Sequence, residues 1–410
     1  MRHRAHPELT RQPDDRGLPV PHHVDREFWA RHFGLGLTSA RRLPRRARPT
    51  PGHSRRPERT GLRRCRNGKP SVVRVSMVGE PSPQLAALEA ALSALGHEVA
   101  VHGHDGVDAD LVDRLRDAWT TEPPEVVHAH SWLSGMASVL AVGARPVAKV
   151  LSVPMPGSLD AEVQRLERLV CRRVDRVLAP GSAQVRRMAA LGVPRSQISV
   201  VPPGVDVERF TPHGPSPGRG AVHRLLAVGD LVVHNRFDLP ISVLGVLGDT
   251  ELVVAGGPLR RNPEAKRLLR CAKHYGVQDR LHLLGPVDDM PALYRSADIV
   301  VCPPARSAFG TVALEAMACG VPVIASAVGG LADTVVNEVT GLLVPPLRPA
   351  DLVRAVRHTL ADAALREAFG AAGRDRACAR FSWERVAADT ARAYARAAYG
   401  AAPALQRSCR

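Results

Sequence analysis

The sequence lacks the features that mark several common classes of protein. Only 4% of its residues are Phe, Trp or Tyr, and no apolar run is long and continuous enough to cross a membrane. The longest nearly uncharged run, residues 316–332, is interrupted by Gly320, Pro322, Gly329 and Gly330, which is typical of a helix end followed by a strand and a turn. The first residues also lack the apolar segment of a secretory signal.

The cysteines indicate neither a disulfide framework nor a metal site. There are seven, none forms a Cys-x-x-Cys pair, and none lies near a spaced set of histidines. Several fall in apolar helix or strand patterns, where free thiols are commonly buried. We therefore expect reduced thiols, no bound metal and a cytoplasmic protein.

The basic charge is concentrated at one end of the chain. The net charge is +16, of which residues 1–70 carry +12 and the other 340 residues only +4. Nucleic-acid binding by the body of the protein therefore has no special support. Residues 1–70 are rich in Arg, Pro and His and are predicted to be a disordered tail. Alternatives for the tail are a misplaced start codon, a basic arm that contacts an anionic membrane or nucleic acid, and a transit-like peptide.

From Val72 onward, short apolar segments alternate with amphipathic ones, which predicts parallel sheets covered by helices on both faces. A Pro- and Gly-rich linker at 202–222 divides this alternation in two. The predicted domains are an N-terminal domain at 71–201 and a C-terminal domain at 223–380, followed by a crossing helix and tail at 381–410. The predicted strands are 72–78, 97–101, 126–130, 148–153, 176–179, 198–201, 224–228, 251–255, 281–284, 299–302, 321–325 and 342–344. The predicted helices include 83–95, 110–119, 133–142, 160–174, 182–191, 263–275, 310–319 and 330–336, and residues 349–399 are expected to be helical.

A signature in the second half carries a family resemblance. Residues 308–325 (AFGTVALEAMACGVPVIA) resemble the donor-site motif of the retaining GT-B glycosyltransferases of family 4, also called glycosyl transferases group 1. Residues 328–330, 340–344, 126–130 and 198–210 are similar to that family as well. The resemblance spans roughly residues 72–400 and implies two Rossmann-like, doubly wound domains that face a cleft. It also implies retaining transfer of a sugar from a UDP- or GDP-linked donor to an unknown acceptor, with no other cofactor.

The signature also indicates where a donor would bind. Gly310 is predicted to open a helix just after a strand, so that the backbone N–H groups of Gly310, Thr311 and Val312 form an anion site suited to a diphosphate. The resemblance assigns the ribose hydroxyls to Glu315 on the same helix.

A second glycine-rich turn contributes to the predicted donor site. Gly256 and Gly257 follow the strand at 251–255 and would let the backbone approach the nucleoside closely.

The sequence departs from the family pattern at several donor positions. Ser307 stands where the family has a second carboxylate, and Ser152 where it often has a histidine. Asp230 and Asn235 replace the family's Arg and Lys, which face the donor phosphates. The glycine-rich loop after the first strand is shortened to residues 79–83. Losing one preorganised donor of this kind typically costs about 10²–10³ in rate.

Two readings of these departures stay open. Arg236 and Arg306 lie beside the altered positions and could substitute for the missing cations. The protein would then be an active transferase. Alternatively, it is a catalytically impaired pseudo-glycosyltransferase that acts as a nucleotide-binding or partner-regulating module. His128 and His130 share one face of a strand, and we expect them to be structural or cleft-lining rather than metal ligands.

Overall fold

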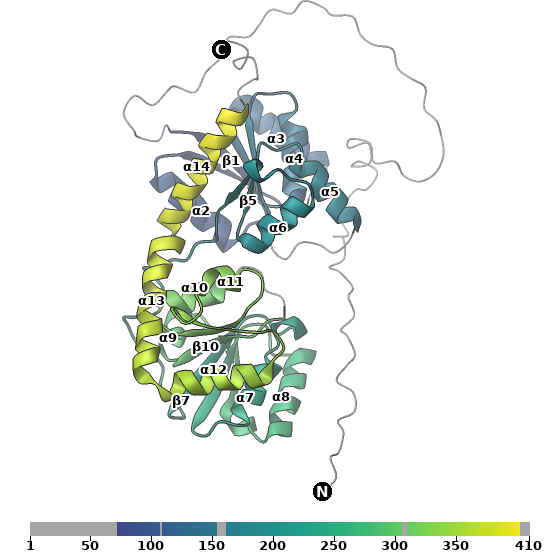
Figure 1. Cartoon of the computed structure of the whole chain (residues 1–410). Coiled ribbons are helices and arrows are strands. Elements are labelled where there is room, and N and C mark those ends of the chain that lie inside the picture. Colours follow the sequence, from purple (N-terminus) through teal and green to yellow (C-terminus); the bar gives the residue numbers. More distant parts are fainter. Residues whose placement is uncertain (1–71, 107–108, 154–160, 306–309, 402–410) are drawn as a thin grey trace, which may run out of the picture.

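The computed structural model describes residues 72–106, 109–153, 161–305 and 310–401. The predicted tail at 1–70, Arg306 and Ser307 lie outside these residues. Two α/β lobes lie one above the other, and a pair of long C-terminal helices runs along both (Figure 1). None of the described helices is long and apolar enough to span a bilayer.

The first lobe contains a six-stranded parallel sheet in the order β2-β1-β3-β4-β5-β6. The strands are β1 (Arg74–Gly79), β2 (Glu98–Gly103), β3 (Val126–Ala129), β4 (Ala148–Ser152), β5 (Arg176–Ala179) and β6 (Ile198–Val200). Its helices are α2 (Pro83–Ala94), α3 (Ala109–Thr121), α4 (Trp132–Val142), α5 (Ala161–Cys171) and α6 (Ser182–Ala190).

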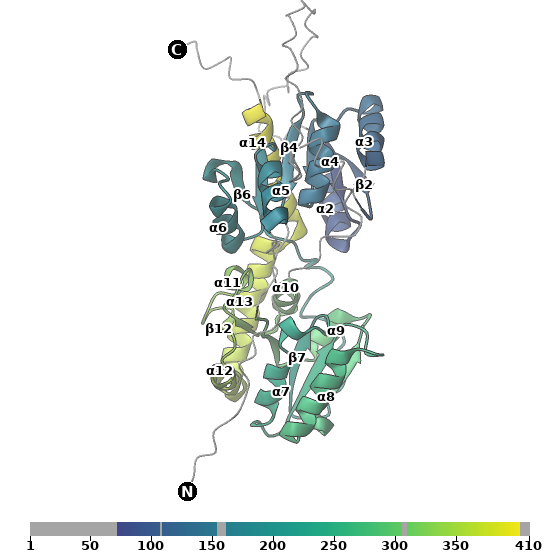
Figure 2. The same cartoon turned by 90° about the vertical axis from the view of Figure 1, so that its right-hand side faces the viewer.

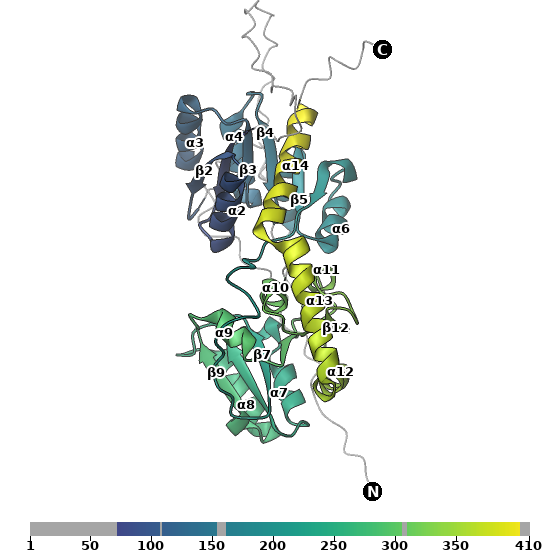
Figure 3. The same cartoon turned by 90° about the vertical axis from the view of Figure 1, so that its left-hand side faces the viewer.

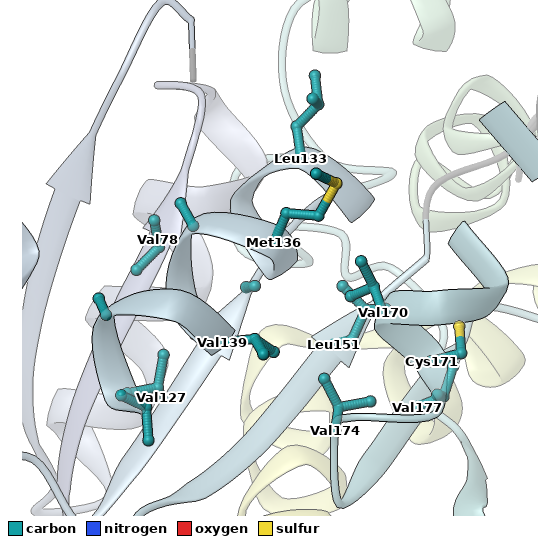
Figure 4. Packing of buried hydrophobic residues seen from close by; sticks show 14 of the residues in the cluster. Val78, Val127, Leu133, Met136, Val139, Leu151, Val170, Cys171, Val174 and Val177 are labelled. Carbon is teal, nitrogen blue, oxygen red and sulfur yellow. The ribbon is translucent and has the colours of Figure 1, made fainter. Parts of the chain in front are cut away.

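Two apolar clusters hold the helices to this sheet. On one face, α3, α4 and α5 pack on the strands around buried residues such as Met136, Leu151 and Val170 (Figure 4). On the other face, Leu85 and Leu92 of α2 pack with Tyr394 of the C-terminal helix α14 (Trp383–Ala401). Figure 2 shows α4 and α5 on the near side of the lobe and α14 on the far side. Burial on both faces explains why the strands read as continuous apolar runs.

The second lobe repeats this arrangement with the strand order β12-β11-β10-β7-β8-β9. The strands are β7 (His223–Val228), β8 (Thr250–Ala255), β9 (Leu281–Gly285), β10 (Ile299–Cys302), β11 (Val323–Ser326) and β12 (Gly341–Val344). The helices are α7 (Asp238–Leu244), α8 (Pro263–Tyr275), α9 (Met290–Arg295), α10 (Thr311–Ala318), α11 (Leu331–Thr334), α12 (Pro349–Ala361) and α13 (Ala363–Phe381). Helices α7, α8 and α12 cover one face, while α9, α10 and α13 cover the other.

The predicted α/β fold class is confirmed, and each predicted strand is present within one or two residues of its expected ends. The predicted helix at 330–336 is shorter, because α11 spans only Leu331–Thr334. The helical stretch expected at 349–399 is three helices. It is interrupted at Asp362 and Ser382, which both have extended backbone conformations. The Asp362 side chain caps α13 by accepting a hydrogen bond from the N–H of Leu365 at 2.9 Å.

The connection between the lobes is locked where the chain crosses back. The N–H of Val205 donates to the carbonyl of Phe381 at 2.8 Å, and Val205 forms a β-bridge with Ser382. Next to it, Gly204 lies against the indole of Trp383, the first residue of α14. A Cβ at Gly204 would lie 2.5–2.8 Å from ring atoms of Trp383. Figure 3 shows α13 beside the second lobe and α14 continuing along the first.

A further contact spans the two lobes directly. The N–H of Ser182, at the start of α6, donates to Oδ2 of Asp333 in α11 at 2.8 Å. The position of Asp333 is supported by Arg376 of α13, which donates to the carbonyls of Asp333 and Thr334 at 2.8 Å. The relative placement of the lobes therefore depends on a small set of contacts from the linker, α13 and α14.

We expect Gly204→Ala to destabilise the protein by about 1–3 kcal/mol, because a methyl group there must displace the Trp383 ring. Gly218→Ala is the matched control, since nothing lies within 4 Å of a Cβ at that position. Thermal unfolding followed by circular dichroism compares the two variants. Equal melting temperatures would contradict the tight packing of this joint.

Candidate functional site

Each sheet has one topological switch point, and the two switch points face the same space. In the first sheet the strand order reverses between β1 and β3, and in the second between β7 and β10. Ligands of doubly wound sheets bind beyond the carboxyl ends of the strands at such points. The carboxyl end of β1 leads to Glu80 and that of β3 to His130. The carboxyl end of β10 leads through a short loop to α10.

A cleft of about 620 Å³ lies between the lobes at these ends. The first lobe and α14 contribute most of its wall, and the second lobe contributes Gly310 and Thr311. Ser152, at the end of β4, also lines it. The structure thus brings together Gly310, Thr311 and Ser152 with His128 and His130, the two histidines expected to be structural or cleft-lining. The other described candidates, Val312, Glu315, Gly256, Gly257 and Arg236, lie outside this lining.

The N-terminus of α10 is built as the sequence predicts. Gly310 adopts a left-handed conformation with φ 84° and ψ 45°, and a Cβ there would lie 2.6 Å from Cδ2 of Leu331. Only glycine fits both constraints. No side chain of the described residues caps the helix, so among them nothing competes with a ligand for its first N–H groups. Val312 packs partly buried on the core of the second lobe and can contribute only its backbone.

Glu315 lies one turn further along α10 and is held by a buried tyrosine. Its Oε2 accepts a hydrogen bond from the Tyr294 hydroxyl at 2.7 Å. Tyr294, on α9, is fully buried and packs edge-on against Phe210, with 5.9 Å between the ring centroids. Oε1 of Glu315 has no hydrogen-bond partner in the described part of the chain. One oxygen is therefore fixed while the other can accept from a ligand.

The electrostatic surroundings keep this pair in complementary protonation states. Burial raises the pKa of the Glu315 carboxyl, and the Tyr294 hydrogen bond and the charge of Arg209 oppose the rise. Burial and the nearby carboxylate raise the pKa of Tyr294 well above its ordinary value, so its hydroxyl remains a donor. Burial also raises the pKa of Cys302 and of Cys319 to about 12, so neither thiol adds a second negative charge beside Glu315.

Near the two positions where the family has cations, the side chains of Asn235 and Arg236 form hydrogen bonds or ion pairs with residues close in the sequence. Asp230 is exposed just after β7, and the side chain of Asn235 donates to its carbonyl at 2.8 Å. Arg236 forms a two-point ion pair with Asp238 at 3.0 and 2.9 Å. Arg267 contacts the same carboxylate at 3.3 Å. Burial would raise the pKa of Asp238, but the hydrogen bonds and charges of these two arginines outweigh it and hold that pKa low. Arg236, predicted as a substitute cation, is therefore already paired.

Contacts within the chain require glycine at positions 256 and 257, and the sequence did not indicate these contacts. A Cβ at Gly256 would lie 2.5 Å from the carbonyl oxygen of Gly229, and one at Gly257 would lie 2.8 Å from the nitrogen of Leu231. Both glycines have positive φ values, 115° and 63°. The turn after β8 thus lets two loops of the second lobe meet backbone to backbone. These contacts require glycine at both positions whether or not a nucleoside binds there, and the predicted approach to a nucleoside stays a prediction.

The cleft floor in the first lobe contains a buried histidine network. Nδ1 of His128 and the hydroxyl of Tyr394 on α14 are 2.8 Å apart, and Nε2 and the hydroxyl of Ser152 are also 2.8 Å apart. The ring of His130 lies against that of His128, with 4.1 Å between centroids. Burial lowers the pKa of His130 to about 4. Burial and the neighbouring His130 hold the pKa of His128 well below its ordinary value.

Sequence reasoning missed the residues that support these two groups. Tyr294 is 21 positions from Glu315, and Tyr394 is 266 positions from His128. The only signal was the scarcity of tyrosine, with four in the chain. No group of three or more potential metal ligands occurs among the described residues.

Comparison with known proteins identifies the family. The family model described as "Glycosyl transferases group 1" matches residues 221–376, and the one described as "Glycosyltransferase Family 4" matches residues 106–209. A D-inositol 3-phosphate glycosyltransferase of Geodermatophilus obscurus is 34% identical over 335 residues, which is 76% of this chain and 70% of that protein. The chain belongs to the group 1 glycosyl transferases. The predicted resemblance is confirmed.

Other members and structures agree with this assignment. A D-inositol 3-phosphate glycosyltransferase of Xylanimonas cellulosilytica is 35% identical, covering 67% of this chain and 72% of that protein. Sucrose-phosphate synthase of Thermosynechococcus elongatus aligns with a TM-score of 0.68 at 23% identity, covering 79% of this chain and 98% of that one. Anabaena HepE in complex with UDP aligns with a TM-score of 0.68 at 18% identity, covering 78% and 99%. These structures establish the predicted GT-B fold.

The half-buried His130, whose pKa is lowered by desolvation, predicts a stability that depends on pH. Below about pH 6.5 the unfolded chain takes up a proton that folded His130 resists, so stability falls between about pH 6.5 and 4. The loss from this residue approaches about 3 kcal/mol, at about 1.4 kcal/mol per pH unit. His130→Gln should flatten the decline of the unfolding free energy, measured by urea titration. The exposed His358→Gln is the control and should leave the slope unchanged. A variant slope equal to the parent's would contradict the assignment.

Proposed function

We propose that the protein transfers a sugar, with retention of anomeric configuration, from a UDP- or GDP-linked donor to an acceptor bound in the cleft. The observation that carries this proposal is the uncapped N-terminus of α10 at Gly310, which opens on the cleft with Glu315 one turn behind it. The N–H groups of Gly310, Thr311 and Val312 would hold the diphosphate. Glu315 would accept hydrogen bonds from the ribose, because Tyr294 fixes its second oxygen.

In this reaction the main task of the chain is to stabilise the leaving nucleoside diphosphate. The bond between the anomeric carbon and the diphosphate oxygen breaks, and the acceptor oxygen forms the new bond to that carbon. The acceptor's proton leaves to the nucleoside diphosphate or to water. Backbone N–H groups already in place contribute without reorganisation. Retention rests on the family resemblance, since stereochemistry is not visible in the chain's own residues.

The relatives supply two supporting observations about the donor and acceptor classes. HepE is described in complexes with UDP and with UDP-glucose, which supports a UDP-linked donor as the first to test. The two relatives described above are named for inositol 3-phosphate, which makes a small polyhydroxylated acceptor the starting point.

The replacement of two cationic residues by Asp230 and Asn235 lowers the expected rate of transfer. Asp230 places a negative charge after β7, and Asn235 and Arg236 are occupied within their loop. Each preorganised donor lost typically costs about 10²–10³ in rate, although such losses do not multiply simply. We therefore expect slow turnover with nucleotide binding retained. Binding without any measurable transfer would favour the impaired pseudo-glycosyltransferase.

We expect Glu315→Ala to weaken UDP binding by about 1.5–3 kcal/mol, the range for hydrogen bonds to a charged group. That corresponds to roughly 10- to 150-fold in Kd by calorimetry. Transfer from the donor should fall at least as far. Glu367→Ala is the control, because Glu367 is exposed on α13. Parental affinity in Glu315→Ala, with the fold intact, would remove Glu315 from the site.

The double substitution Asp230→Arg with Asn235→Lys tests the donor side in the opposite direction. Replacing a repelling carboxylate and a neutral amide by two cations should tighten UDP binding at least tenfold, or about 1.4 kcal/mol. Asp279→Arg with Gln278→Lys adds the same charge at exposed positions before β9 and serves as the control. Equal tightening in both double variants would mean that only net charge matters and that Asp230 does not face the donor.

A further inference from the structure

The acceptor side of the cleft is defined here as its lining from the first lobe, the start of the linker and α14. Its described residues lack the positive charge that would bind an anionic acceptor. Its titratable lining residues are Glu80, His128 and His130, and the other lining residues are uncharged polar or apolar. Among these described residues there is no Lys or Arg. The one side chain with a full charge, Glu80, is negative.

The histidines do not supply the missing positive charge. Burial lowers the pKa of His130 to about 4 and holds that of His128 well below its ordinary value. Both rings are therefore neutral at pH 7. A phosphate monoester carries nearly two negative charges at that pH, and proteins hold such groups with Arg, Lys or several aligned N–H donors. No described side chain of this wall would therefore pair with a phosphate as a cation.

The same wall presents an apolar surface instead. Leu85, Leu88, Leu178 and Val386 each expose less than one tenth of their surface and belong to the core behind the cleft. The indole of Trp383 joins them, fixed against Gly204. This surface is rigid, because its side chains come from a strand end and from two packed helices, α2 and α14. It can therefore exclude water from one flat or aliphatic face of a ligand.

The hydroxyl groups at the floor of the wall are already paired, whereas one buried nitrogen of the lining is not. The hydroxyl of Ser152 bonds to His128, that of Ser131 to Ser134, and that of Thr390 to the carbonyl of Val386. Nε2 of His130 is buried and has no hydrogen-bond partner in the described part of the chain. A neutral imidazole nitrogen can exchange a hydrogen bond with a hydroxyl group. Leaving it unpaired carries a desolvation cost that a bound hydroxyl would remove.

We propose that the acceptor side of the cleft takes an uncharged hydroxyl compound with an apolar face, with one hydroxyl on Nε2 of His130, rather than a phosphorylated cyclitol. This inference rests on the proposed function and specifies its acceptor. It separates the chain from the relatives named for inositol 3-phosphate, although about a third of the aligned residues are identical in them.

Binding measurements on the full chain test charge and apolar contact separately. Two matched pairs of probes are titrated by calorimetry, with and without UDP: myo-inositol against D-inositol 3-phosphate, and methyl against 4-nitrophenyl β-D-glucoside. The 4-nitrophenyl glucoside should bind at least tenfold more tightly than the methyl glucoside. Inositol 3-phosphate should bind no more tightly than inositol. Tighter binding of the phosphate, or no gain from the aryl group, overturns the proposal.

Failure of the proposed function gives a different result. If UDP does not bind but the glucoside pair behaves as expected, the donor assignment fails and the acceptor inference stands. If UDP binds and no uncharged probe does, the acceptor inference fails alone. The His130→Ala variant should lose at least fivefold in affinity for the 4-nitrophenyl glucoside and keep parental affinity for UDP. Unchanged glucoside affinity in that variant contradicts the role given to Nε2.

A charge-adding variant provides the positive control. Gln84 is exposed at the start of α2 and lines the cleft, so Gln84→Arg should add a cation without burying it. Inositol 3-phosphate should then bind at least tenfold more tightly than to the parent. Gln278→Arg, which adds the same charge on the surface before β9, should not change phosphate binding. If Gln84→Arg leaves the phosphate affinity at the parental value, the wall does not select by charge and the proposal is wrong.

Discussion

The joint between the linker and the break from α13 to α14 is the constraint on which the site depends. Val205 bonds to Phe381, and Gly204 receives the indole of Trp383 without a Cβ between them. Because α14 then packs on the first sheet through Tyr394, this joint sets how the two lobes face each other. Trp383 also lines the cleft. A single residue therefore serves both the placement of the lobes and the surface that would contact an acceptor.

The two sides of the cleft have opposite chemical character. The donor side has an uncapped helix N-terminus and a carboxylate whose second oxygen is fixed by Tyr294. The acceptor side has neutral histidines, an apolar wall and one buried nitrogen without a partner among the described residues. An anionic donor and an uncharged acceptor fit this division. Under the proposed function, Asp230 and Asn235 would weaken the hold on the leaving diphosphate and leave the helix N-terminus as its main support.

The alternation of apolar and amphipathic segments was enough to predict both sheets, because the central strands are buried on both faces. The helix that Gly310 opens followed from the local signature, whereas the positive φ of Gly310 was not predicted. Contacts between distant residues could not be predicted this way. Nothing near Glu315 indicates Tyr294, and nothing near His128 indicates Tyr394. The pairing of Arg236 with Asp238 and the packing of Gly256 on Gly229 depend on how loops meet, which residue order alone does not show.

A crystal structure of the full chain with UDP tests the central claim most directly. The account predicts that the diphosphate lies on the N–H groups of Gly310, Thr311 and Val312 and that the ribose hydroxyls contact Oε1 of Glu315. It also predicts that Tyr294 keeps its hydrogen bond to Oε2. A nucleotide bound elsewhere, or a Glu315 carboxylate that contacts only Tyr294 in the complex, would contradict it.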